Sequence, residues 1–457
     1  MLFASQPFLL VFLPVVLGLY YAVAASRAAR QGVVIGASLV FYGLWDWRFV
    51  PFLLGLTGFN QMMAMAWGRS RWRGWLWGGV VCNLLVLFGF KYMDWVVGGV
   101  LHALGWAHAP WPVILPLGLS FFVFQKISYL VDLGRGQARV YRLADFVEFV
   151  TFFPQLVAGP IVRHNELIPQ FDASPRNGHM WANLGQGGLL VLVGLGKKAG
   201  LADTLGGICA PVFAAAASGH APGLAAAWLA AVAYMLQIYF DFSGYSDMAI
   251  GMALMMGIRL PFNFNAPYAA GSIRDFWRRW HMTLSRFLRD YLYIPLGGNR
   301  CAPARQAFNV VVTMALAGVW HGAGWTFMLW GVLHGVALAV AHAWDRAGLR
   351  INRVAGHVLT LLFVLLTWVV FRADSLPAAG RMLAGMAGMG GGGAPGRHPF
   401  VLGLAAVVAL VGPASQQVVL ERVRPAPWLA VGAGIAFVLL VFLIGGRPPE
   451  PFIYFQF

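Results

Sequence analysis

The side chain with the clearest capacity for chemistry is the imidazole of His321, in the stretch Ala-Gly-Val-Trp-His-Gly-Ala-Gly-Trp at residues 317–325. The ring stands inside an apolar run from residue 307 to residue 340. Burying an imidazole without a partner is costly, and ionisable groups at membrane depth are functional candidates by default. The structural alternative is a histidine bonded to a neighbouring carbonyl between two packed helices. The stretch alone leaves both interpretations open.

Small and aromatic residues flank this histidine. Gly318, Gly322 and Gly324 allow the backbone to break or to approach another helix closely. Trp320 and Trp325 are expected to wall a pocket around the ring. The stretch therefore predicts a sheltered imidazole beside a break or close approach of the chain.

A second histidine, His281, lies in a stretch where arginines alternate with aromatic residues, from residue 274 to residue 300. This pattern predicts a basic amphipathic helix at the cytoplasmic interface. Arginines in such a helix bind lipid headgroups or the phosphates of an anionic substrate. Both ligands remain open at this point.

Two further segments carry polar groups inside apolar sequence. Residues 234–248 contain Asp241 and Asp247, whose carboxylates need partners at this depth. Three roles are open for these carboxylates: they could orient a histidine, contact a substrate or pair with the arginines that follow. A structural network of paired charges is favoured over a functional role by about two to one. Residues 116–132 contain Gln125 among polar positions that recur every three or four residues. Such positions join a helix to its neighbours or line a wet cavity.

The segment from residue 152 to residue 163 contains two prolines and a glycine. A continuous spanning helix resists these residues, whereas broken backbone is tolerated at membrane depth when protein buries it. The segment is therefore predicted to be a re-entrant hairpin, with an interfacial loop as the alternative.

Apolar runs dominate the rest of the chain. Hydrophobic residues make up 60% of the 457 positions and charged residues 11%, which is typical of a polytopic membrane protein. Because about 20 residues cross the hydrocarbon layer as a helix, the runs predict an all-α chain with about 10–13 spanning or re-entrant helices. These runs are residues 7–25, 33–50, 51–67, 75–100, 112–131, 147–161, 185–200, 224–252, 306–322, 325–344, 355–371, 399–418 and 427–445.

The chain has a formal charge of +16, from 32 Lys and Arg against 16 Asp and Glu. In a membrane protein such an excess reflects cytoplasmic loops and lipid headgroups, so nucleic acid is not an expected partner. Arginine clusters near residues 27–30, 69–73 and 135–142 fall in alternate loops. The positive-inside rule then places the N-terminus outside the cytoplasm.

No soluble domain and no internal repeat is evident, so residues 1–457 are predicted to form one integral-membrane domain. It comprises scaffold helices at 1–110, a core at about 112–372 and C-terminal helices at 399–445. Cys82, Cys209 and Cys301 are far apart, which predicts neither a disulfide framework nor a metal site. The first apolar run has no clear cleavage site and is expected to be a retained span.

Nine stretches together resemble the membrane-bound O-acyltransferase family, in the branch of alginate O-acetyltransferases and D-alanyl transfer proteins. Each stretch is weak alone, whereas the ordered set is highly specific and covers most of the chain. They are residues 116–125, 153–161, 239–247, 261–265, 276–281, 293–298, 320–322, 371–373 and 455–457.

The resemblance implies a ring of tilted helices around a central tunnel in the bacterial inner membrane. His321 matches the histidine in the tunnel, and His281 matches a second, more variable polar position. In the family, an acyl group from a cytoplasmic thioester, acetyl-CoA or an acyl carrier, ends on a hydroxyl handled at the outer face. Separate periplasmic proteins usually complete the transfer, and no permanently bound cofactor is implied.

Roles for individual residues follow from this expected chemistry. Acyl transfer to an alcohol needs a base and stabilisation of an oxyanion, and burial disfavours the imidazolium cation, so His321 is the expected base. His281 is expected to place the donor or the acceptor. Arg278, Arg279 and Arg286 are candidates for holding the donor's phosphates, and the candidates for orienting the histidine or contacting substrate are Asp241, Asp247, Trp320, Trp325 and Gln125.

Other functions stay open on the residues alone. D-alanine is an alternative acyl group, and lipid, peptidoglycan or cellulose is an alternative acceptor to alginate. Intramembrane charges are also compatible with a transporter, although the chain lacks an inverted repeat. A third possibility is a scaffold within a polysaccharide export complex, which would tolerate loss of His321.

Overall fold

The structure of the protein is a computed structural model that describes residues 2–107, 109–111, 113–391, 399–424, 426–446 and 450–453. Its regular elements are helices, and no β-strand occurs within these ranges. Of the stretches that predicted the family, residues 455–457 lie outside the described residues. The chain forms two compact units: unit 1 contains Met1–Val193, Tyr245–Pro261 and Arg424–Pro449, and unit 2 contains Gly194–Gly244, Phe262–Val423 and Glu450–Phe457.

Seven helices within the described ranges are long and apolar enough to cross a membrane, which confirms the prediction of an all-α polytopic membrane protein. They are Phe49–Ser70, Gly74–Ala103, Met180–Ala217, Leu224–Met255, Trp325–Arg346, Arg353–Arg372 and Pro427–Gly445. The sequence suggested more segments because it counted short and broken ones. The run at 112–131, for example, becomes helical only at Leu119.

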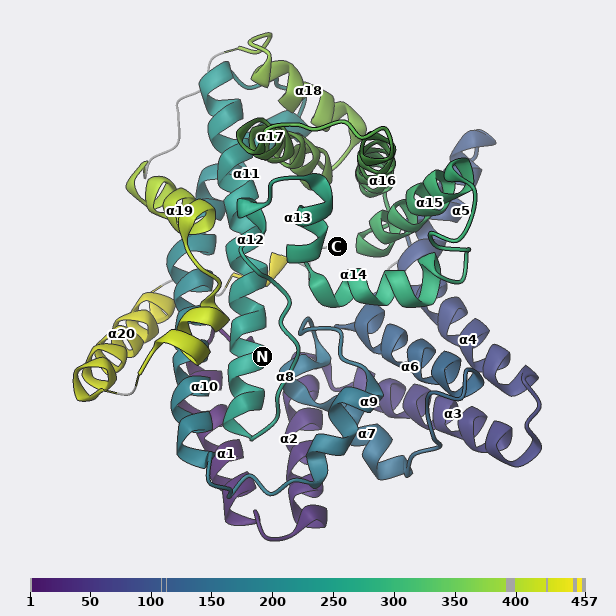
Figure 1. Cartoon of the computed structure of the whole chain (residues 1–457), viewed down its shortest axis with the longest axis vertical. Coiled ribbons are helices and arrows are strands. Elements are labelled where there is room, and N and C mark those ends of the chain that lie inside the picture. Colours follow the sequence, from purple (N-terminus) through teal and green to yellow (C-terminus); the bar gives the residue numbers. More distant parts are fainter. Residues whose placement is uncertain are drawn as a thin grey trace. The chain divides into compact units, whose positions relative to one another are not determined.

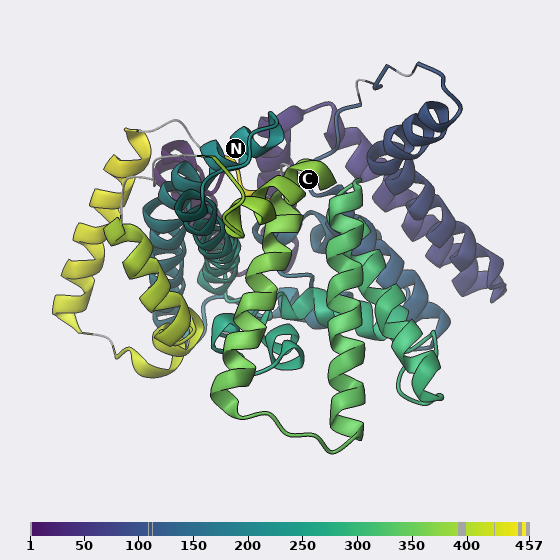
Figure 2. The ribbon, with the colours of Figure 1, turned by 90° about the horizontal axis from the view of Figure 1, so that it is seen from above.

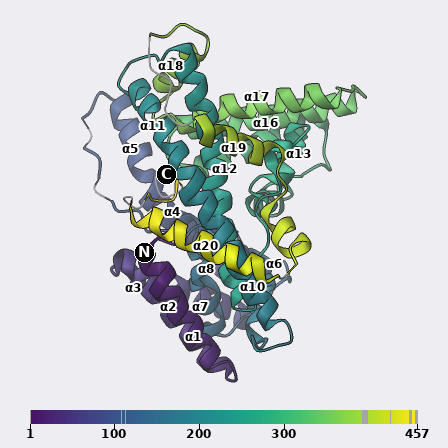
Figure 3. The ribbon, with the colours of Figure 1, turned by 90° about the vertical axis from the view of Figure 1, so that its left-hand side faces the viewer.

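Unit 1 holds the first part of the chain and two later helices. Figure 3 shows α1 and α2 side by side, and Ser26 caps α2 by accepting a hydrogen bond from the N–H of Ala29. The helix α12 (Leu224–Met255) is shared, because its residues from Tyr245 onward belong to unit 1 and its earlier residues to unit 2. The other elements of unit 1 are η1 (Phe8–Phe12), α1 (Leu13–Ala22), α2 (Arg27–Asp46), α3 (Phe49–Ser70), α4 (Gly74–Leu87), η2 (Phe88–Tyr92), α5 (Met93–Ala103), α6 (Leu119–Gly134), α7 (Leu143–Thr151), α8 (Phe153–Leu156), α9 (His164–Leu167), η3 (Ile168–Asp172), α10 (Met180–Leu195) and α20 (Pro427–Gly445).

The proline-containing segment of unit 1 is buried from residue 151 to residue 162. Its broken backbone is satisfied locally, since the N–H of Phe153 donates to Ser38 Oγ at 3.1 Å and Gln155 Nε2 donates to the carbonyl of Phe149 at 2.7 Å. Buried irregular backbone of this kind is tolerated at membrane depth. Burial thus favours the re-entrant interpretation over an exposed interfacial loop.

Unit 2 holds both candidate histidines. Figure 1 labels most of its helices, and Figure 2 shows α16 and α17 as neighbours joined by the short loop at residues 347–352. Its elements, with α12 entering from Leu224, are η4 (Gly196–Ala202), α11 (Asp203–Ala217), η5 (Pro267–Ala269), α13 (Ile273–Arg279), α14 (Met282–Leu288), η6 (Arg289–Tyr293), α15 (Pro303–His321), α16 (Trp325–Arg346), α17 (Arg353–Arg372), α18 (Leu376–Met386), α19 (Pro399–Val411) and η7 (Gln417–Arg422).

Helices α15 and α16 pack backbone against backbone. A Cβ atom on Gly318 would overlap the carbonyl oxygen of Phe327, and one on Gly331 would overlap the carbonyl oxygen of Met314. Small residues permit this close approach between membrane helices. Gly322 sits just after α15, and a Cβ there would overlap the ring of Phe327. The predicted break and close approach around the histidine are therefore confirmed.

The basic stretch at 274–300 is not the single amphipathic helix that its pattern predicts. It forms α13, α14 and η6, with a break at Trp280 and His281. Hydrogen bonds from outside the stretch account for the break, because the N–H of Asn265 donates to the carbonyl of Arg279 and the N–H of Met282 donates to the carbonyl of Asn263, both at 2.9 Å. This tertiary pairing overrides the local helical periodicity.

Candidate active site

His321 is the last residue of α15, and only 4% of it is exposed. Aromatic rings enclose it edge to face: ring centroids lie 4.9 Å away for Trp320, and 5.4 Å away for Trp330 and for Phe371. These rings come from α15, α16 and α17 respectively. Such an enclosure keeps bulk water from an imidazole and weakens the stabilisation of its cation.

Trp325, the other predicted wall residue, lies at the first position of α16 and is 61% exposed. Thr326 and Trp330, four residues apart on the same helix, are the buried ones. Because residues four apart share a helix face, Trp330 rather than Trp325 is turned toward the histidine. The periodicity of α16 contained this signal, although Trp330 was not among the predicted site residues.

His281 lies close to His321 in space although 40 residues separate them in sequence (321 minus 281). Their ring centroids are 6.5 Å apart, and His281 is fully buried. Its φ angle is +42°, in the left-handed region that non-glycine residues seldom adopt. Backbone strain of this kind costs on the order of 1–3 kcal/mol and clusters at functional sites.

The partner of His281 fixes its tautomer. Its Nδ1 lies 2.9 Å from Asn263 Oδ1, which also accepts hydrogen bonds from the N–H and the Oγ1 of Thr283. Two donors at one atom identify it as the amide oxygen, so the imidazole must carry its hydrogen on Nδ1. Nε2 then holds a lone pair.

That lone pair is buried and has no hydrogen-bond partner among the described residues. His281 lies outside the seven apolar spans, and burial lowers its pKa to about 3, so the imidazole is neutral near pH 7. A buried acceptor that awaits a donor is the feature expected of a group that binds a substrate hydroxyl. Sequence reasoning found His281 but missed Asn263, because nothing local links positions 18 residues apart.

His334 provides a contrast within the same unit. Trp277 Nε1 donates to its Nδ1 at 3.2 Å, and its Nε2 lies 3.0 Å from Thr367 Oγ1. The hydroxyl of Thr367 donates to the carbonyl of Val364, so Nε2 of the histidine is the donor in that pair. Both ring nitrogens are satisfied, and His334 is a structural histidine that joins α13, α16 and α17.

Asp241, a candidate for orienting the histidine, lies in a different polar cluster. Its carboxylate is 2.7 Å from Lys198 Nζ and accepts a hydrogen bond from the N–H of Ile453 at 2.8 Å. Lys198 also lies 2.7 Å from Asp203. The described contacts of Asp241 do not include His321. This network lines a cavity of about 160 Å³ together with Gln237, Arg372 and Glu450.

The cluster around Asp241 still influences the histidines through the next residue on α12. Phe242 packs edge to face on the ring of His281 at 4.6 Å and contacts Phe452 at 5.5 Å. Lys198 and the backbone of Ile453 hold Asp241, and this in turn fixes the ring of the adjacent Phe242 that packs against His281.

The arginine candidates flank His281 in sequence. Arg278 is exposed, Arg286 is half-buried, and Arg279 Nε pairs with Asp275 at 2.9 Å. Their role toward a donor stays a prediction. Gln125 on α6 and Asp247 on α12 are both buried and belong to unit 1, so their predicted roles likewise remain predictions.

Comparison with known proteins adds an independent line of information. The model of the membrane-bound O-acyltransferase family, MBOAT, matches residues 90–371. A probable alginate O-acetylase AlgI of Pseudomonas aeruginosa is 41% identical over 401 residues, covering 85% of this chain and 75% of that protein. A peptidoglycan O-acetyltransferase of Helicobacter pylori is 38% identical over 428 residues, covering 86% and 80%. A teichoic acid D-alanyltransferase of Streptococcus thermophilus is 28% identical over 251 residues, covering 52% and 59%.

Proposed function

Because the chain belongs to the membrane-bound O-acyltransferase family, we propose that it moves an acetyl group from a cytoplasmic thioester, acetyl-CoA, to hydroxyl groups of an extracytoplasmic polysaccharide such as alginate. The observation that carries this proposal is the pair of buried imidazoles with centroids 6.5 Å apart, one of which holds an unpartnered, buried Nε2 among the described residues. Two sheltered imidazoles suit the proton transfer that ester formation requires.

The proposed step forms one bond and breaks one. The hydroxyl oxygen of the acceptor attacks the thioester carbonyl carbon, the carbon–sulfur bond breaks, and the hydroxyl proton passes through the imidazole of His321 to the leaving thiolate. Exclusion of water by the aromatic enclosure limits hydrolysis of the thioester. Nε2 of His281 accepts a hydrogen bond from a second hydroxyl of the acceptor, beside the attacking one, because its tautomer leaves only a lone pair there.

The other predicted residues have roles of their own in the proposed reaction. Trp320 walls the reacting groups, and Arg278, Arg279 and Arg286 hold the donor's phosphates on the cytoplasmic side. Asp241 and Asp247 hold α12 and orient the site, and Gln125 contacts substrate. Residues 1–457 then act as one integral-membrane domain around a tunnel, so that the acetyl group crosses while the donor stays inside.

The proposed setting is the bacterial inner membrane, with several passes and the N-terminus outside, as the arginine distribution supports. The acetyl group then emerges where surface polymers are finished, and periplasmic proteins complete its transfer. Relatives named as an alginate O-acetylase and a peptidoglycan O-acetyltransferase support acetyl as the acyl group. D-alanyl transfer from a carrier protein is the second candidate, supported by the D-alanyltransferase relative.

Complementation tests this function directly. The chain is introduced into a Pseudomonas aeruginosa strain that lacks its alginate O-acetylase but keeps the periplasmic partners, and O-acetyl esters on secreted alginate are measured by NMR. We expect restored acetylation, with label from [14C]acetyl-CoA reaching polymer in membrane vesicles. If label reached the polymer only from a D-alanyl carrier thioester, the transferred group would be D-alanyl and the proposal of acetyl transfer would be wrong. If acetylation were confined to peptidoglycan, the acceptor would be peptidoglycan and not alginate.

His281→Ala is expected to lower acetyl transfer about 10²-fold, the lower end for a group that assists proton transfer. The residue holds a second hydroxyl of the acceptor and does not take the proton of the attacking one, so the loss should be smaller than for the base. Transfer is measured in vesicles against His220→Ala, which removes an exposed histidine. A loss as complete as that of the His321 variant would instead mean that the two imidazoles share the catalytic role.

A further inference from the structure

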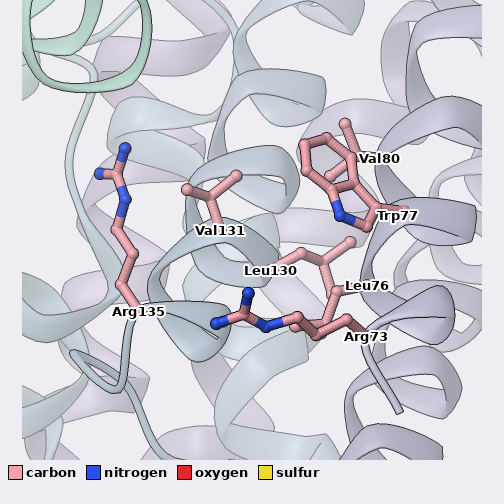
Figure 4. A pocket seen from close by; sticks show the side chains of 8 residues that line it. Arg73, Leu76, Trp77, Val80, Leu130, Val131 and Arg135 are labelled. Atoms are coloured by element: carbon pink, nitrogen blue, oxygen red, sulfur yellow. The ribbon is translucent and has the colours of Figure 1, made fainter. Parts of the chain in front are cut away.

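A groove of about 260 Å³ lies between α4 and α6 of unit 1, whereas His281 and His321 belong to unit 2. Its walls are mainly apolar, and two arginines stand among the lining residues (Figure 4). The residues that line it are Arg73, Leu76, Trp77, Val80, Leu130, Val131, Gly134 and Arg135. An apolar trough with cationic groups is the shape and charge that suit an amphiphilic anion.

Both arginines lie at the same end of the groove because α4 and α6 run in opposite directions. Arg73 immediately precedes α4, and Arg135 immediately follows α6. Both side chains are exposed, and Figure 4 shows the two guanidinium groups on the same side of the cluster formed by Leu76, Trp77 and Val80. Arg135 forms an ion pair with Asp132, whereas Arg73 has no carboxylate partner among the described residues. Positive charge at the groove is therefore incompletely compensated.

Neighbouring tryptophans place this end of the groove at a membrane surface. Trp72 and Trp77 are 63% and 65% exposed and flank the first residue of the apolar span Gly74–Ala103. Exposed tryptophans at the end of a span mark the level of the lipid headgroups. The arginines then stand at headgroup level, while Leu76, Val80 and Leu130 line the groove farther along α4 and α6.

We propose that this groove binds one anionic phospholipid, with its phosphate between Arg73 and Arg135 and an acyl chain along Leu76, Val80 and Leu130. Basic sites between membrane helices select lipids that carry net negative charge, because a zwitterionic headgroup offers no net attraction. The arginine-rich loops on either side, at residues 69–73 and 135–142, favour the cytoplasmic leaflet. This binding is independent of the proposed acetyl transfer.

Native mass spectrometry of the full-length protein tests the proposal. Detergent-purified, delipidated protein is titrated with phosphatidylglycerol or with phosphatidylethanolamine of the same acyl chains. The wild type should bind one phosphatidylglycerol in preference. Arg73→Gln combined with Arg135→Gln should raise the Kd for phosphatidylglycerol roughly 25-fold, since each arginine near an anionic headgroup contributes roughly fivefold. Arg69→Gln with Arg142→Gln removes the same charge from exposed positions that do not line the groove and should change little.

A second variant tests the apolar part. A Cβ on Gly134 would already lie 3.1 Å from Leu76 Cδ1, so Gly134→Leu should fill the groove and lower binding with both arginines intact. Equal binding of the two lipids by the wild type would overturn the proposal, as would an unchanged Kd in the Arg73 and Arg135 double variant. Displacement of the lipid by millimolar inorganic phosphate would show a phosphate site instead of a lipid site.

Discussion

Replacement of His321 by alanine is expected to abolish acyl transfer, with a loss of at least about 10³-fold, while the protein still folds. The imidazole is the proposed base, and none of the surrounding rings of Trp320, Trp330 and Phe371 can accept a proton in its place. Removing the ring leaves a cavity among aromatic side chains, which costs stability, while the glycine-mediated packing of α15 on α16 at Gly318 and Gly331 stays in place. Transfer is measured in membrane vesicles, and folding is judged by monodisperse elution in detergent.

A second substitution distinguishes the role of His321 as a base from its contribution to packing. His321→Asn keeps a polar group of related size and lacks a basic nitrogen, so it should be as inactive as His321→Ala while recovering most of the lost thermal stability. Retained transfer in a folded variant of either kind would rule out the assignment of His321 as base. Activity that returns with His321→Asn alone would indicate a hydrogen-bonding role instead.

The end of α15 at His321 and its close packing on α16 could be predicted from the sequence because the signals there are local. The sequence predicted a close approach at Gly318, and a Cβ there would overlap the carbonyl oxygen of Phe327 on the facing helix. The all-α membrane class followed from apolar runs for the same reason, since hydrocarbon thickness sets the length of a span.

Features that depend on distant pairing were harder to predict. The break before His281 arises from hydrogen bonds to residues near Asn263, and the periodicity of arginines and aromatics from 274 to 300 gives no indication of them. The carboxylate of Asp241 was correctly expected to need a partner, but the partner is Lys198, 43 residues earlier (241 minus 198). Composition predicts that a buried charge is paired, whereas only the fold decides with which group.

Gly331→Leu is expected to remove most of the folded protein, because no side chain can move aside to accept the new atoms. The Cβ position at 331 overlaps the carbonyl oxygen of Met314 and lies 3.0 Å from the Cα of Ala315, both of them backbone atoms of α15. The two helices would have to separate, at a cost of at least about 3 kcal/mol for overpacking of this severity. Trp330, adjacent to the glycine, would then move away from His321. The amount of monodisperse protein and its Tm in detergent measure the effect.

The control is Val336→Leu, which introduces the same residue type on the exposed face of the same helix with the addition of one methylene group, and which should leave both quantities unchanged. If Gly331→Leu gave normal yield and normal Tm, the contact between α15 and α16 would have to be looser than the structure shows. A folded Gly331→Leu protein with lost transfer would be the most informative outcome. It would mean that the helix pair tolerates separation but that the distance from Trp330 to His321 controls the chemistry, so the glycine would act by positioning the base.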